Sequence, residues 1–233
     1  MITRSGASLS KAVFDKAMRC HYAREEANVL RLMEMTQLPK TAAILDVGCG
    51  KGRYLALLAR HGYKPIGVDA SNRMIDESRA KGFVCLNDVE FMTDARVYDM
   101  ILMSHVIEHL SPGELLLFMD RYLDRLRLGG FLIIATPLLT PGFYNDFDHV
   151  RPYYPLGIDK VFEEPEAQVQ FEAKNRLKRL ALLYRQGPIH EMFLGRCGPV
   201  ATCITTVGLI AYMASFGLVS MRTGWSGLYK KTA

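Results

Sequence analysis

Short apolar runs alternate with helical patterns over residues 42–137. Five runs, each bounded by turn residues, cover 44–47, 66–68, 82–86, 98–104 and 131–137. Such runs are typical of strands that are buried on both faces of a parallel sheet. The segments between them carry apolar residues at the spacing of helices that cover a sheet. The alternation predicts a doubly wound α/β domain.

Helical spacing also marks longer segments outside these runs. Residues 9–35 and 113–126 predict helices, and one face of 168–186 carries Leu177, Leu180, Ala181 and Tyr184. Residues 197–221 hold no charged side chain, and we predict a covered helix at 200–216 within them. That run is long enough to span a bilayer, but its threonines, serines and glycines disfavour insertion.

The turn after the first strand carries the strongest functional signal. It reads Asp46-Val47-Gly48-Cys49-Gly50-Lys51-Gly52, with glycine at every second position. Glycine lets the backbone turn sharply and lets a ligand approach it closely. The spacing is neither that of a phosphate loop nor G-x-G-x-x-G. An ordinary strand-to-helix turn is the alternative.

This turn resembles motif I of the class I S-adenosylmethionine (SAM)-dependent methyltransferases. The resemblance implies that SAM is the cofactor and that the loop residues contact it. These residues are Asp46, Gly48, Cys49 and Gly50.

Two further acidic residues follow the second and third strands. A carboxylate can accept from both hydroxyls of a ribose, and the family resemblance gives this role to Asp69, with Ala70 beside it. Capping of the helix 72–81 is the alternative for Asp69. The resemblance also implies that Asp88 and Val89 flank the adenine, although an Asn-Asp pair is also common in turns.

The fourth strand runs into Ser104-His105-Val106-Ile107-Glu108-His109. Helical spacing places His105, Glu108 and His109 on one face, and open α/β sheets bind ligands at this end of their strands. Ser104 and His105 could line the methionine part of SAM, and Glu108 and His109 could brace the sheet. A metal site is a third role, because ubiquinone-pathway O-methyltransferases carry a similar Glu-x-x-Glu-His stretch. His105 replaces the first Glu, which disfavours magnesium, so we predict no metal.

The fifth strand follows Leu128-Gly129-Gly130, again as in this family. Four motifs in order identify the chain as a member of the class I methyltransferases. The resemblance implies a mostly parallel seven-stranded, Rossmann-like sheet with a helical insertion before the last two strands. It also places that strand pair at 217–229.

The acceptor side is expected after the fifth strand, in Asp146-Phe147-Asp148-His149-Val150-Arg151. His149 is the best-placed general base, because an imidazole takes a proton near neutral pH. Arg151 could hold an anionic acceptor. The stretch resembles one in bacterial methyltransferases with glycan or lipid-linked substrates. A hydrogen-bond network of His149 and Arg151 with the loop carboxylates is an equal alternative.

Length, charge and cysteine content indicate the domain count, the partners and the compartment. The 233 residues fit one domain, divided into a helical lid (1–38), a SAM-binding core (42–137), an acceptor-side loop and basic insertion (138–196) and a final helix with two strands (197–233). The net charge of +5 lies in residues 151–233. No aromatic-interleaved basic stretch accompanies it, so we expect no nucleic acid partner. Five cysteines without metal spacing indicate reduced thiols in the cytoplasm.

The leading interpretation is O-methylation of a small-molecule, saccharide or lipid-linked acceptor, with His149, Arg151 and His105 as the catalytic candidates. N-methylation of an amine and a non-catalytic, partner-binding SAM fold are the alternatives. The basic segment 168–196 is expected to form a mobile helix over the acceptor site. It could also contact a membrane surface or a second subunit.

Overall fold

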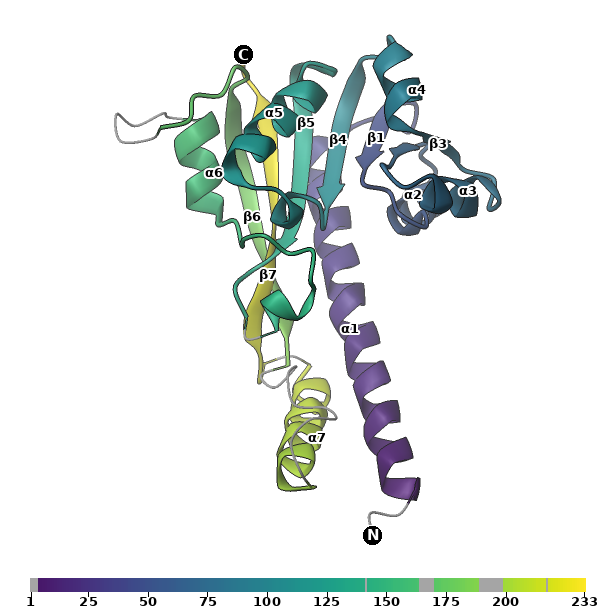
Figure 1. Cartoon of the computed structure of the whole chain (residues 1–233), viewed down its shortest axis with the longest axis vertical. Coiled ribbons are helices and arrows are strands. Elements are labelled where there is room, and N and C mark those ends of the chain that lie inside the picture. Colours follow the sequence, from purple (N-terminus) through teal and green to yellow (C-terminus); the bar gives the residue numbers. More distant parts are fainter. Residues whose placement is uncertain (1–3, 141, 164–169, 189–198, 217) are drawn as a thin grey trace.

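Seven strands form one sheet in the order β3-β2-β1-β4-β5-β7-β6 (Figure 1). This structure is a computed structural model, and it describes residues 4–140, 142–163, 170–188, 199–216 and 218–233. The strands are β1 (Ile44–Val47), β2 (Ile66–Val68), β3 (Val84–Leu86), β4 (Tyr98–Ser104), β5 (Leu126–Pro137), β6 (Leu177–Gly187) and β7 (Met221–Lys231). The first five are parallel, and β7 lies antiparallel between β5 and β6. The predicted α/β class with a mostly parallel seven-stranded sheet is therefore confirmed.

Helices cover both faces of the sheet. They are α1 (Arg4–Thr36), α2 (Arg53–Arg60), α3 (Asn72–Arg79), α4 (Asp88–Thr93), α5 (Pro112–Leu123), α6 (Pro155–Phe162) and α7 (Pro199–Ala214), with short 3₁₀ turns η1 (Ile107–His109) and η2 (Phe143–Asn145). Alternate residues of each strand enter opposite cores. Ile101 and Met103 of β4 pack with α4, α5 and α6, whereas Met100 and Leu102 pack with α1 and α2.

The predicted helix at 168–186 is wrong, because its second half is the edge strand β6. Two register shifts in the pairing of β6 with β7, at Arg179/Ala181 and Arg185/Gln186, explain the error. Each shift breaks the period-two alternation that marks a strand, and Leu177, Leu180, Ala181 and Tyr184 then match a helix by chance. The flanking residues 168–169 and 189–196 lie outside the described parts of the chain.

The last two strands are also arranged differently from the expected pair at 217–229. β6 precedes α7, and only β7 follows it. The two strands therefore pair with each other although α7 separates them in the sequence. A helix does precede both strands, as expected, but it is α6.

Helix α1 packs against two different parts of the molecule. Near its carboxyl end, Val29, Leu32 and Met33 are buried against the sheet. Nearer its amino end, Ala17 packs against Leu209 and Tyr212 of α7, beyond the edge of the sheet (Figure 1).

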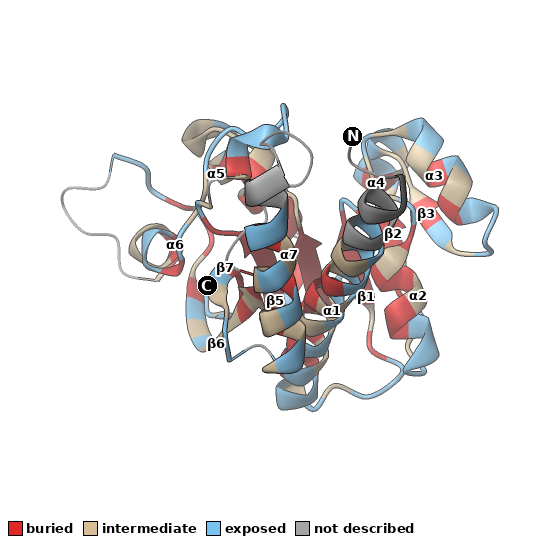
Figure 2. Ribbon diagram, turned by 90° about the horizontal axis from the view of Figure 1, so that it is seen from below, coloured by how far each residue is buried: buried red, intermediate tan, exposed pale blue. Residues whose placement is uncertain are grey.

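The outer side of α7 is exposed between residues 203 and 214 (Figure 2), so the prediction of a covered helix is wrong for that side. Among the described residues, no helix combines the length and the apolar character that crossing a bilayer requires.

Candidate active site

The glycine loop after β1 has a backbone that only glycine adopts readily. Gly48, Gly50 and Gly52 have φ angles of 69°, 51° and 80°, in the left-handed region. A Cβ on Gly48 would also lie 2.5 Å from Cγ2 of Val106, whereas a Cβ on Gly50 would meet no atom within 4 Å. The space above Gly50 is therefore open to a ligand, as the expected SAM contact requires.

Asp69 braces this loop. Its Oδ2 accepts a hydrogen bond from the Gly50 amide (2.8 Å), and its Oδ1 accepts one from the Ser71 amide (2.8 Å). Helix α3 begins after Ser71 without any side-chain cap, and Asp69 instead accepts a hydrogen bond from the backbone amide of Ser71 where the helix begins. Each carboxylate oxygen keeps a second lone pair, so bracing of the loop and contact with a ribose are compatible. Ala70 is exposed directly beside it.

Asp46 lies at the base of the loop and is buried. Burial, together with the nearby Cys85 and Asp69, raises the pKa of Asp46 well above its usual value. Its Oδ2 has no hydrogen-bond partner among the described residues. A buried polar atom without a partner is costly, and a donor from a bound SAM would remove that cost.

The expected adenine side is formed by the turn into α4. Asn87 accepts a hydrogen bond from the Glu90 amide (2.9 Å) in a capping box, so its side chain is committed to the helix. Asp88 lies 3.2 Å from Nη2 of Arg121 in an exposed ion pair. Val89 is one of the most exposed apolar residues of this half of the chain. An open apolar surface there is compatible with a stacked adenine.

At the end of β4, Ser104 is nearly buried, and His105 has a φ of 55°. A non-glycine residue in this region is strained and persists only where neighbours hold it. His105 is held by two carboxylates: Nδ1 lies 3.1 Å from Oε1 of Glu108, and Nε2 lies 3.0 Å from Oε2 of Glu25. Arg185 of β6 also pairs with Glu25.

The charges in this cluster compensate each other. Burial alone would lower the pKa of His105, but the charges and hydrogen bonds of Glu25 and Glu108 raise it to about 9. Burial would raise the pKa of Glu25, but His105, Arg185 and Arg53 hold it below its usual value. His105 is therefore an imidazolium at neutral pH. In that form it has no free lone pair with which to take up a proton.

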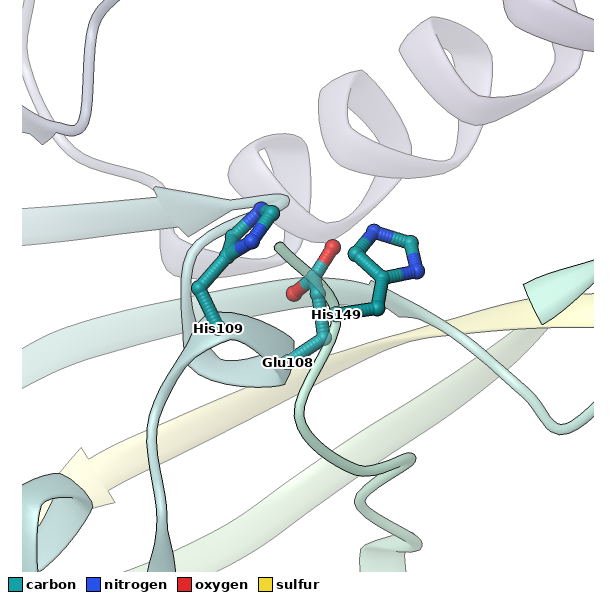
Figure 3. A group of neighbouring side chains, drawn as sticks. All are labelled: Glu108, His109 and His149. Atoms are coloured by element: carbon teal, nitrogen blue, oxygen red, sulfur yellow. The ribbon is translucent and has the colours of Figure 1, made fainter. Parts of the chain in front are cut away.

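Glu108 also belongs to a second group of side chains (Figure 3). Glu108, His109 and His149 each offer one ligand atom, and these atoms lie within 4.8 Å of one another. Both histidines are oriented by backbone carbonyls: Nδ1 of His149 lies 2.7 Å from the Phe143 oxygen, and Nδ1 of His109 lies 3.1 Å from the Asp148 oxygen. Glu108 therefore contacts His105 through one carboxylate oxygen and also belongs to the group with His109 and His149.

The acceptor loop is tied to this group through its backbone. The amides of Val150 and Arg151 both donate to the carbonyl of Glu108. Nε2 of His149 lies 3.7 Å from Oδ2 of Asp146, as the network alternative expects. The guanidinium of Arg151 lies over the ring of Tyr153 (5.3 Å), with the side chain exposed.

Glu25 and Arg185 were missed as site residues. They are 160 positions apart and meet only because α1 crosses the sheet beside β6. One signal was available: Glu25 precedes Val29 and Leu32 by four and seven positions, so a carboxylate occupies the apolar stripe of a helix. Such a residue needs a buried partner, but the sequence does not indicate which one.

A family profile described as a methyltransferase domain matches residues 14–180. A ubiquinone biosynthesis O-methyltransferase of Mesorhizobium japonicum is 34% identical over 101 residues, which cover 40% of this chain and 40% of that protein. The corresponding enzyme of Pelagibacter ubique is 24% identical over 151 residues, or 59% of this chain and 62% of that protein. The chain thus matches less than two thirds of the length of these curated relatives.

Solved structures are similar over most of the chain. A SAM-dependent methyltransferase from Archaeoglobus fulgidus has a TM-score of 0.60 at 19% identity, covering 88% of this chain and 92% of that one. Magnesium protoporphyrin IX methyltransferase from Synechocystis PCC 6803, with bound SAM, has a TM-score of 0.58 at 13% identity, covering 93% and 83%. At these identities the likeness shows the fold alone.

Proposed function

Since the chain belongs to the methyltransferase domain family, we propose that it transfers the methyl group of SAM to an oxygen of a small-molecule, saccharide or lipid-linked acceptor. When bound, SAM supplies the electrophilic methyl. The residues of this chain then have to hold SAM, orient the acceptor and take up the proton of its hydroxyl. Asp46, Gly48, Cys49, Gly50, Asp69, Ala70, Asp88, Val89 and Ser104 are proposed to contact SAM.

His149 is proposed as the general base. Its Nδ1 is the nitrogen that donates to the Phe143 carbonyl, which leaves a lone pair on Nε2. The ring packs against Phe143 (4.5 Å between centroids) and lies beside His109 (4.9 Å), so its orientation is restricted. This fixed orientation of the His149 ring is the observation that carries the proposal of oxygen as the acceptor atom.

The other two candidates take supporting roles in this proposal. His105, as an imidazolium between Glu25 and Glu108, holds the end of β4 in place and does not take the proton. Arg151 is exposed next to the loop and is proposed to bind an anionic group of the acceptor. A lipid-linked acceptor remains part of the proposal, but the strand β6 (11 residues) occupies more than a third of the segment 168–196 that was expected to reach a membrane.

Methyl transfer from SAM carrying a labelled methyl group, measured over separate pools of phenols, saccharides, quinone precursors and amines, tests this proposal. Oxygen methylation predicts label in a hydroxyl-bearing pool, and His149→Ala lowering turnover by about 10²–10⁴-fold. His61→Ala, at an exposed histidine on the far end of α2, is the matched control. Label confined to amines, or turnover unchanged in His149→Ala, would contradict the proposal.

A further inference from the structure

Helix α7 exposes apolar side chains, whereas a surface helix usually exposes polar ones. Between 203 and 214 every exposed residue is apolar: Cys203, Ile204, Val207, Ile210 and Ala214. The polar side chains point inward instead, since Thr205 is buried and the Tyr212 hydroxyl donates to the carbonyl of Gln186 (3.0 Å). No charged residue occurs in the helix. An exposed face of this composition marks a contact surface.

The spacing of these residues indicates what the surface contacts. Cys203, Val207, Ile210 and Ala214 follow one another at intervals of four, three and four. This is the spacing of a seam through which one helix packs against another. Cys203 and Ala214 are small, so a second helix can approach closely at both ends of the seam.

Apolar exposure continues beyond the helix. Phe216 and Leu218 are 90% and 91% exposed, and Val219 follows them. They follow the exposed Ile204, Val207 and Ile210 of α7 in the sequence. The run of exposed apolar side chains therefore extends beyond the end of the helix.

Charge favours a second copy of the chain over an anionic membrane. Lys16 and Arg19 of the neighbouring helix α1 are exposed, whereas its contact with α7 runs through Ala17. Arg24 of α1 is already engaged there, because its guanidinium lies over the ring of Tyr212 and donates to the Phe216 carbonyl. An uncharged helix face can meet its own copy without repulsion between like charges. An anionic surface on that face would find no basic residue in α7 to bind.

We propose that the exposed face of α7 is a homodimer interface, in which the α7 helices of two chains pack against each other through the 203–214 seam. The two α1–α7 pairs then form a four-helix arrangement. The contact is isologous, so each residue of the seam lies near the same seam of the partner copy. The proposal does not depend on the acceptor or on the methyl transfer reaction.

Sedimentation equilibrium of the full chain over a range of concentrations is the direct test. The parent protein should sediment as a dimer, and Val207→Asp should raise the dissociation constant at least about 100-fold, because it places two unpaired carboxylates in an apolar interface. Leu117→Asp is the matched control, since Leu117 on α5 is 74% exposed, compared with 60% for Val207. It should leave the dissociation constant within about twofold of the parent value.

A second variant avoids any loss of folding. Both cysteine variants are made in a Cys203→Ala background, because Cys203 is itself an exposed thiol of the seam. Val207→Cys is then expected to give a disulfide-linked dimer under mild oxidation by air with a copper catalyst, and Leu117→Cys is expected to stay monomeric on a non-reducing gel. A monomeric parent at all concentrations, or a dimer that Val207→Asp leaves intact, would overturn the proposal. So would a monomer that floats with phosphatidylglycerol vesicles and loses this binding in Val207→Asp, because the face would then belong to a lipid surface.

Discussion

The two sides of the candidate site assemble their functional groups by different routes. On the glycine-loop side, Gly50 and Asp69 are 19 positions apart, and each follows directly from the end of a parallel strand. On the other side, His105, Glu25 and Arg185 come from a strand end, a helix and an edge strand, separated by at least 80 positions. The first arrangement is a local consequence of the sequence, whereas the second depends on the complete fold.

The two sides should therefore respond differently to mutation. A change in the glycine loop should weaken SAM binding with a modest cost in stability. A change in the cluster of Glu25, His105 and Arg185 should destabilise the whole domain, because that cluster joins α1, β4 and β6.

The largest effect is expected for Glu25→Gln. This change leaves the buried Arg185 and the His105 imidazolium without their shared carboxylate, and should lower the free energy of unfolding by about 3–5 kcal/mol. Urea denaturation followed by circular dichroism measures it. Glu26→Gln is the control: Glu26 pairs with Arg53 at a partly exposed site, and less than about 1 kcal/mol should be lost. Equal losses in the two variants would contradict the role given to Glu25.

Gly48→Ala should have the next largest effect, on SAM binding. The left-handed φ and the contact with Val106 together should cost about 2–3 kcal/mol in affinity, on the order of 10²-fold. Gly82 shares the left-handed φ (84°), but a Cβ there would meet no atom within 4 Å. Calorimetry should therefore find the parent affinity in Gly82→Ala. A similar loss in both variants would show that backbone strain at any glycine produces the effect.

A smaller loss of SAM affinity, about 1–3 kcal/mol, is expected for Asp69→Ala, since a charged hydrogen-bond partner is removed. Asp76→Ala, at an exposed carboxylate on the following helix α3, is the control. Calorimetric titration of the two variants with SAM gives the comparison. Unchanged affinity in Asp69→Ala would remove Asp69 from the SAM site.

The smallest effect concerns pH. Because the folded pKa of His105 is raised from 6.5 to about 9, its proton contributes stability that is fully present below about pH 6.5. That stability is lost as the pH rises through about 9. We expect a decline of about 1 kcal/mol over this range, after allowance for screening by solvent. Urea midpoints between pH 6 and pH 10 should show the decline in the parent and a flatter profile in His105→Gln.

The difference between the two sides also explains what the sequence predicted. The strands around the glycine loop and the α/β class followed from short apolar runs and from alternate glycines, which are local patterns. The strand β6 was taken for a helix because two register shifts disturb its alternation. The pairing of Glu25 with Arg185 follows from no local pattern, since it requires α1 to lie against β6 in the finished fold.

The acceptor loop was predicted only in part from the sequence. The sequence placed His149 near the end of the sheet, and the amides of Val150 and Arg151 do attach this loop to the Glu108 carbonyl. The proximity of His149 to His109 depends on that attachment and was not predicted. In this region the sequence indicates candidate residues but not which of them meet.

The central claim is that SAM binding and proton removal are performed by separate groups, Asp69 on the glycine-loop side of the site and His149 on the acceptor-loop side. Measuring both the SAM dissociation constant and single-turnover methyl transfer at saturating SAM, in Asp69→Ala and in His149→Ala, tests it most directly. We predict that Asp69→Ala changes the dissociation constant and keeps most of the transfer rate, whereas His149→Ala lowers the transfer rate and keeps the dissociation constant. If both variants change the same quantity, the two sides do not act separately and the account is wrong.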